Sequence, residues 1–344
     1  MQQNSIYKKA LYLAVPMMIQ NGITNAVSLV DNLMVGSLGT EKMTAVSIAG
    51  QLFFVFFLAV FGGLSGPGIY SAQYFGQGNK EGYQKIFRLK VWITALLTVV
   101  GVIVFLVGGE WLIGLYLKGS GGNLDAGLTL ESALSYLRIM LIGLVPFAIT
   151  QIYAGSLREM GESMKPMLAG LVSVVVDIVF NYFLIYGKFG FPRLEVKGAA
   201  IATVMARFAE MFVVIIWTHV EIEKYSFLKN VYRTLRISLQ EMMPVIIKGL
   251  PIFFNEFLWA GGMAVLTQCY SMKGLEVIAG LNISNAICNL LNVVFIAMGN
   301  AVGIIMGQFL GASKFEEAKK NANKLMWFTA MLCVGLTVIL IILS

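Results

Sequence analysis

Long apolar stretches recur along the whole chain, and short segments between them hold most of the charged residues. A bilayer core is about 30 Å thick, and an α-helix needs roughly 20 apolar residues to cross it. The pattern predicts nine membrane-spanning helices, at residues 11–35, 44–70, 89–109, 130–156, 166–187, 198–219, 242–270, 277–305 and 323–343. We therefore expect an all-α, multi-pass membrane protein.

The longest charged loop separates the sixth expected helix from the seventh. We expect residues 1–220 to form a six-helix bundle, residues 221–241 a cytoplasmic loop, and residues 242–344 a partial bundle of three helices. Lys and Arg gather on the cytoplasmic loops of membrane proteins. With the N-terminus inside, sixteen of these residues fall on inner segments and six on outer loops, which predicts a cytoplasmic N-terminus.

The chain repeats itself after a shift of 235 residues, without a gap. Over residues 68–99, eleven of 32 positions are identical to the second copy, and Gln73 matches Gln308 while Gly76 matches Gly311. Six expected helices separate the copies, so both have the same orientation, as in repeats related by an axis along the membrane normal. The second copy stops before its fourth helix, so we expect a complete molecule to have about three further helices.

Composition agrees with a membrane protein, since 12% of the residues are charged and soluble domains have about 25%. The net charge of +7 is explained by the inner loops, so we expect no nucleic-acid partner. The sequence has no Gly-x-x-x-x-Gly-Lys-Ser/Thr motif, so we expect that the protein neither binds nor hydrolyses ATP. His219 is the single histidine, which excludes a Ser-His-Asp triad. We therefore expect that the protein is not an enzyme.

Four carboxylates fall well inside expected helices, at Asp31, Asp177, Glu210 and Glu256. A charged side chain at the bilayer centre costs about 2.5–3.5 kcal/mol on insertion scales, so each requires a reason. Asp31 ends a polar stripe whose members recur at helical spacing and share one face, namely Asn21, Thr24, Ser28 and Asp31. We interpret the stripe as the wall of a hydrated cavity with a carboxylate for Na⁺ or H⁺; interhelical hydrogen bonding is the alternative.

Asp177 and Asn181 are one helical turn apart in the fifth expected helix. Their oxygens are hard ligands that suit a small cation, and Thr203 in the next helix offers a hydroxyl. An Asp within a membrane also takes up a proton readily. The sequence therefore predicts a cation or proton site here.

The second half offers weaker candidates. Glu256 follows the start of the seventh expected helix and is either a second carboxylate of the site or an interfacial residue. Arg207 and Glu210 are spaced for a structural ion pair. A polar, cavity-facing side of the eighth expected helix is predicted from Asn282, Asn285 and Asn289.

Several motifs resemble the multidrug and toxic compound extrusion (MATE) family. Asp177–Gly187 with Val196–Thr203 is similar to that family's fifth-to-sixth helix signature. The first, seventh, and eighth-to-ninth helix regions of the family are similar to Leu29–Gly36, Gly249–Glu256 and Gly303–Gly311.

The resemblance implies two six-helix bundles around a central cleft, in a bacterial cytoplasmic membrane. It implies export of drugs, hydrophobic molecules and organic cations in exchange for Na⁺ or H⁺ by alternating access, with no other cofactor. By motif position, Glu256 is the second-bundle carboxylate, whose usual partner in a tenth helix is absent. The resemblance also implies a first-bundle cation site, with Na⁺ at Asp31, Asp177 and Asn181, formed by Asp31, Asp177, Asn181 and Thr203.

Two alternatives stay open. A flippase for lipid-linked molecules predicts a larger, basic cavity, whereas few cavity-facing helices here carry Lys or Arg. The second alternative is a truncated membrane protein that does not transport.

Overall fold

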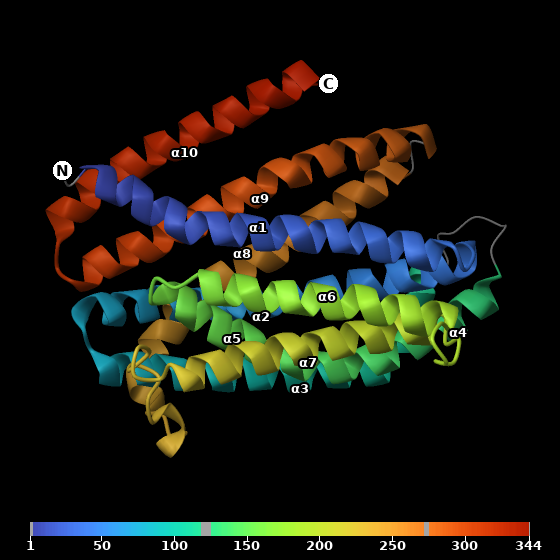
Figure 1. Cartoon of the computed structure of the whole chain (residues 1–344), viewed down its shortest axis with the longest axis horizontal. Helices are drawn as coiled ribbons and strands as arrows, with labels where there is room; N and C mark the ends of the chain where they lie inside the picture. The colour runs from blue at the N-terminus through green and yellow to red at the C-terminus, as the bar shows by residue number, and fades with distance from the viewer. Residues whose placement is uncertain (1–2, 118–124, 272–274, 344) are drawn as a thin grey trace.

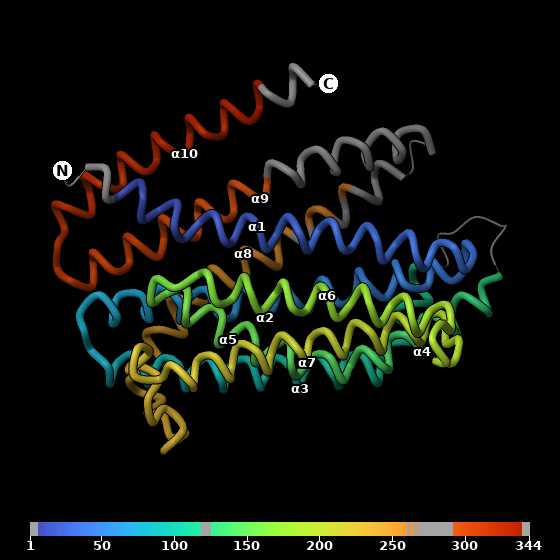
Figure 2. Tube along the Cα trace, viewed as in Figure 1, coloured from blue at the N-terminus to red at the C-terminus, as the bar shows by residue number. Residues whose placement is uncertain are grey.

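The computed structural model describes residues 3–117, 125–271 and 275–343 (Figure 1). The side chains of residues 3–5, 260–261, 264–265, 267–291 and 339–343 lie outside the described set, and the longest of these stretches is drawn grey in Figure 2. Within the described ranges all regular structure is helical. The helices are α1 (Gln3–Gly36), α2 (Thr40–Gln77), α3 (Lys80–Leu117), α4 (Ala126–Met140), α5 (Leu144–Glu159), α6 (Met164–Tyr186), α7 (Val196–Val220), α8 (Leu239–Ser271), α9 (Leu275–Gly311) and α10 (Phe315–Leu343).

The all-helical, multi-pass architecture is confirmed. Eight helical segments of the described chain are long and apolar enough to cross a membrane. The fourth is α4 and α5 joined by the 3₁₀ turn Leu141–Gly143, with Pro146 in the first turn of α5, where its missing N–H costs nothing. The ninth expected span coincides with α10, which is not among those eight.

Several helices are longer than the expected spans. Both α2 and α3 have 38 residues, which is about 57 Å of helix, so their ends extend beyond a bilayer core. We call the end that holds the α2–α3 turn at Gly78 the inner end of the molecule. The turns α5–α6 and α9–α10 lie at the same end (Figure 1, left).

The largest cluster of buried apolar side chains is formed entirely by residues between 35 and 204, with Phe53, Phe56 and Leu137 among its members. A second cluster joins the first half of α1 to α9 and α10, through Leu13, Met298 and others. α1 therefore packs on both halves of the chain, and Figure 1 shows it between α6 and α9. Burial of these apolar surfaces is what fixes α1 beside the polar face of α6.

The segment after α7 is folded onto the inner end rather than extended. Its side chains Tyr225, Leu228 and Val231 are buried. Arg88 donates to the Val231 carbonyl at 2.9 Å, and Gln84 donates to the Lys229 carbonyl at 2.8 Å. These contacts hold the segment against α3.

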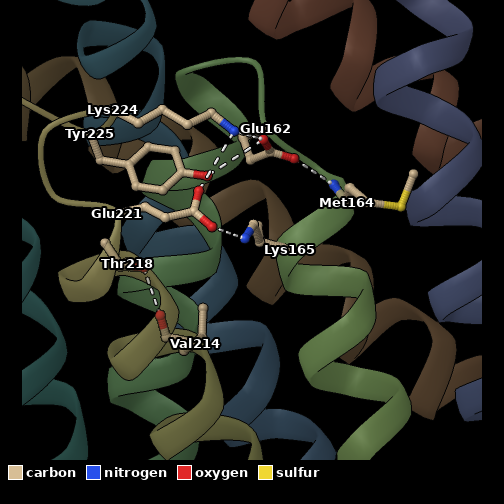
Figure 3. Close-up of polar contacts among 8 residues, drawn as sticks. All are labelled: Glu162, Met164, Lys165, Val214, Thr218, Glu221, Lys224 and Tyr225. Carbon is tan, nitrogen blue, oxygen red and sulfur yellow. Dashed lines mark hydrogen bonds and ion pairs between the residues drawn. The ribbon is translucent and has the colours of Figure 1, made fainter.

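Charged side chains fix the start of this segment to the α5–α6 turn (Figure 3). Lys224 donates to Glu162 at 3.0 Å, and Lys165 donates to Glu221. The ammonium group of Lys165 lowers the pKa of Glu221, and Glu162 raises the pKa of Lys224.

The two repeat copies meet each other where α2 crosses α9 at the inner end. A Cβ atom on Gly76 would overlap the carbonyl oxygen of Gln308, and one on Gly311 would overlap that of Gln73. Ala72 lies against Gly307, and these two positions are also 235 residues apart. The contacts are reciprocal, so the repeat axis passes through this crossing, and glycine is required on both sides of it.

Candidate functional site

Three polar side chains meet between α1 and α6. The Nδ2 group of Asn181 donates to Asp31 Oδ1 at 2.9 Å and to Asp177 Oδ2 at 3.2 Å. Asp177 and Asn181 are buried, at 6% and 1% exposure. The one-turn spacing on α6 places both on one face, and the packing of α1 against α6 places Asp31 opposite them.

Two hydroxyl groups lie next to this polar cluster. Thr203 on α7 lies beside Asp177, and the buried Tyr136 on α4 lies beside Thr203. The structure thus places Asp31, Asp177, Asn181 and Thr203 together. Tyr136 was not expected, because 13 tyrosines are spread over the chain and nothing in the sequence singles it out.

Two oxygens of the cluster are left without a partner. Asp177 Oδ1 and Asn181 Oδ1 are buried and accept no hydrogen bond. An unsatisfied buried acceptor costs about 1–3 kcal/mol. Carboxylate and amide oxygens are hard ligands suited to a small cation. A protonated carboxyl group would also give such an acceptor a hydrogen-bond partner. In the part of the chain that the structure describes, no three His, Cys, Asp or Glu side chains cluster to hold a metal.

A cavity of about 450 Å³ lies beside this cluster. The hydroxyls of Thr24 and Ser28 donate to carbonyls of their own helix, at 2.8 and 3.0 Å, rather than to another helix. The polar stripe of α1 lines the cavity with Asn21, Thr24, Ser28 and Asp31, and the aromatic part of its wall is Phe57, Phe61 and Phe147.

Three more charged side chains line the same cavity, namely Arg158, Arg207 and Glu210. The expected Arg207–Glu210 ion pair is wrong, since no contact within 4.0 Å joins the two in the described chain. The Arg207 guanidinium instead lies over the rings of Phe57 and Phe147, at 4.7 and 4.9 Å from their centroids. Spacing along a helix allowed the pair, but the aromatic wall of the cavity offers the guanidinium a competing position.

A second buried polar network closes the inner end, and sequence reasoning missed it. Lys90 and Glu159 form an ion pair and are 1% and 8% exposed. Gln308 donates to the Glu159 carbonyl at 2.7 Å and accepts from Lys9 at 2.9 Å. The network joins α1, α3, α5 and α9. Lys90 looks like an inner-loop cation in the sequence, and only the packing of α3 on α5 shows that it is buried.

The second-half candidates are only partly placed. Glu256 on α8 is half-buried and packs beside Gly62 of α2, where its Cγ would be 3.4 Å from an added Cβ. The side chains of the three expected asparagines lie outside the described residues, namely Asn282, Asn285 and Asn289.

The family model MatE matches residues 16–183 and 251–344. A probable multidrug resistance protein YoeA of Bacillus subtilis is 26% identical over 98% of this chain and 71% of its own length. A probable multidrug resistance protein NorM of Thermotoga maritima is 26% identical over 90% of this chain and 65% of its own length. The chain therefore spans about two thirds of the curated relatives it matches.

Solved structures share the fold. The outward-facing conformation of a multidrug resistance MATE family transporter of the MOP superfamily superposes with a TM-score of 0.78. It is 23% identical and is covered over 71% of its length, while 96% of this chain is covered. A MATE structure in complex with MaD3S gives a TM-score of 0.80 at 23% identity, over 96% of this chain and 72% of that one.

Proposed function

The chain belongs to the MatE family, and on that premise we propose that it exports drugs and organic cations in exchange for Na⁺ or H⁺ by alternating access. The observation that supports this most is the Asp31–Asn181–Asp177 cluster beside the 450 Å³ cavity. Phenylalanine side chains of α2 and α5 line the cavity, which suits flat hydrophobic molecules, and its carboxylates come from α1, α6 and α7.

The cluster is suited to ion coupling because its two carboxyl groups are neighbours. Two nearby carboxylates repel each other, and a bound proton or Na⁺ between them relieves that repulsion. Asn181 contacts both carboxyl groups, so ion binding changes the contact between α1 and α6. One charge moving through 100 mV supplies about 2.3 kcal/mol, enough to bias a two-state transporter.

The orientation and location follow from the same proposal. The excess of Lys and Arg on the inner segments supports a cytoplasmic N-terminus. The relatives are bacterial, so the membrane is the bacterial cytoplasmic membrane. We also propose that residues 1–220 and 242–344 move as two bundles, with the folded segment between them held on the first.

Ethidium efflux from cells tests the proposal. Asp31→Asn and Asp177→Asn each abolish efflux while the protein is still expressed. Asp125→Asn is the matched control, because Asp125 caps α4 outside the cavity and Asn is an equally good cap. Normal efflux in both cavity variants would contradict the proposal.

The charges of the cavity bear on the alternative of a lipid-linked flippase. The cavity is lined by two arginines and three carboxylates, so it is not predominantly basic. This balance favours a drug or organic-cation substrate over a polyanionic lipid headgroup. A membrane protein that does not transport would show no efflux even in its wild-type form.

A further inference from the structure

One face of α3 holds the segment that joins α7 to α8. Gln84, Arg88 and Trp92 lie on this face, because they are four residues apart. Each donates to a backbone carbonyl of the segment, and the last of these bonds runs from Trp92 Nε1 to the Leu235 carbonyl at 3.0 Å. From Gln84 to Trp92 the helix rises about 12 Å. The segment therefore runs along α3 from the inner end toward the bilayer core.

Two exposed tryptophans mark the position of the bilayer along α3. Trp92 and Trp111 are separated by about 29 Å of helix, and a bilayer core is about 30 Å thick. The sequence between them has a single charged residue, Glu110. Tryptophan is enriched at both membrane–water interfaces, so Trp92 marks the interface at the inner end. The Leu235 carbonyl lies at the same depth, because Trp92 donates to it.

Large apolar side chains of the segment are exposed at this depth. Leu235 and Leu239 are 44% and 66% exposed. Figure 1 shows the segment, in gold, projecting from the bundle beside α3 near the inner end. A leucine exposed at the membrane interface is removed from water by contact with lipid acyl chains. The segment thus has an apolar surface that faces lipid.

The same surface carries positive charge that the carboxylates of the segment do not balance. Arg233 and Arg236 are exposed on either side of Leu235. Arg88 lies one turn before Trp92 on α3. None of these arginines forms an ion pair in the part of the chain that the structure describes. The nearby carboxylates are paired with lysines instead, as Lys165–Glu221, Lys229–Glu223 and Lys85–Glu241.

We propose that this segment binds an anionic phospholipid of the leaflet at the inner end. Arg233 and Arg236, with Arg88 beside them, bind the headgroup phosphate, because a guanidinium group presents paired N–H donors to phosphate oxygens. Leu235 and Leu239 lie among the acyl chains, so a free phosphate ion would use only half of the site. The surface lies outside both cavities, and the inference does not depend on the proposed function.

Native mass spectrometry of the purified full chain in detergent tests the headgroup contacts. Dioleoylphosphatidylglycerol and dioleoylphosphatidylcholine have the same acyl chains and differ in headgroup charge. The wild type binds the anionic lipid about tenfold more tightly, and Arg233→Gln with Arg236→Gln removes that preference. Lys319→Gln with Lys320→Gln is the control, because it removes two exposed positive charges from the inner part of α10, and it keeps the preference.

Two results would overturn the inference. One is an unchanged preference for phosphatidylglycerol in the folded arginine variant. The other is release of the bound lipid by inorganic phosphate, which would show that the acyl chains contribute nothing.

A fluorophore on Leu235→Cys tests the depth of the segment with both arginines in place, and so covers the case in which the arginine variant does not fold. The native cysteines are first replaced, and the full chain is placed in phosphatidylglycerol liposomes. Lipids brominated on their acyl chains quench this fluorophore, whereas one on Lys314→Cys, in the α9–α10 turn, is not quenched. Equal, weak quenching at both positions would place the segment in water and overturn the inference.

Discussion

Asn181 of α6 donates a hydrogen bond to Asp31 of α1 across 2.9 Å, although 150 residues separate them in the chain. The same amide group reaches Asp177 one turn away. A single side chain thus connects the two carboxyl groups and the two helices that carry them. Anything that binds between the carboxyl groups must rearrange this contact.

We expect Asn181→Ala to reduce drug export by about tenfold or more. The variant leaves two buried carboxyl groups without their shared donor, and a hydrogen bond to a charged group contributes about 1.5–3 kcal/mol. Dye efflux per expressed molecule measures this. Asn323→Ala, at an exposed position of α10, is the control, and wild-type efflux by Asn181→Ala would show that the contact is not needed for coupling.

The buried pair Lys90–Glu159 gives a prediction on stability. Lys90→Met leaves the Glu159 charge buried alone, and breaking a buried pair costs about 3–5 kcal/mol. Lys90→Met with Glu159→Gln removes both charges and recovers much of that loss. Thermal unfolding in detergent compares the single and double variants. Equal melting temperatures for the two would mean that the pair is not desolvated as the structure shows.

The glycine crossing between α2 and α9 predicts a conformational effect. Gly311→Ala places a methyl group against the Gln73 carbonyl, and overpacking costs about 1–3 kcal/mol. The two helices separate, and the equilibrium shifts about tenfold toward an open inner end. Gly335→Ala is the control, because nothing lies within 4 Å of its Cβ position.

Spin labels measure that separation. We would place them at the exposed positions Lys80 and Lys314, after the native cysteines are replaced. The account predicts a longer distance population in Gly311→Ala only. Superimposable distance distributions in both variants would contradict a closing role for the crossing.

Acid should weaken the attachment of the segment after α7. Lys165 holds the folded-state pKa of Glu221 below its ordinary value of 4.5. The contribution of Glu221 to folding is therefore complete above that value and is lost as pH falls through the folded pKa. The melting temperature of Glu221→Gln lies below that of the wild type at pH 7, and the difference shrinks at lower pH. A difference that is constant with pH would exclude this contribution.

The sequence predicted the helices well, because long apolar runs leave the backbone in a bilayer no alternative to α-helix. It also placed Asp177 and Asn181 on one face, since their spacing is one helical turn. It could not show that α6 packs against α1, which is what brings Asp31 to Asn181. That contact depends on apolar packing between segments far apart in the chain.

Three other features depend on tertiary contacts that no local pattern encodes. Lys90 lies at the start of the expected span 89–109 and so resembles a loop cation, yet it is inside α3 and α5 buries it with Glu159. Arg207 has the right spacing to pair with Glu210, but its guanidinium lies on two aromatic rings. The repeat was visible in the sequence, whereas the reciprocal contact of its two copies required the structure.

The most direct test of ion-coupled export uses purified protein in liposomes loaded with ethidium. Na⁺ and pH gradients are imposed one at a time, and dye movement is followed by fluorescence. The account predicts that one of the gradients drives dye movement in the wild type and in Asp125→Asn, and that neither gradient drives it in Asp177→Asn. Gradient-driven movement by Asp177→Asn at the wild-type rate would contradict the central claim.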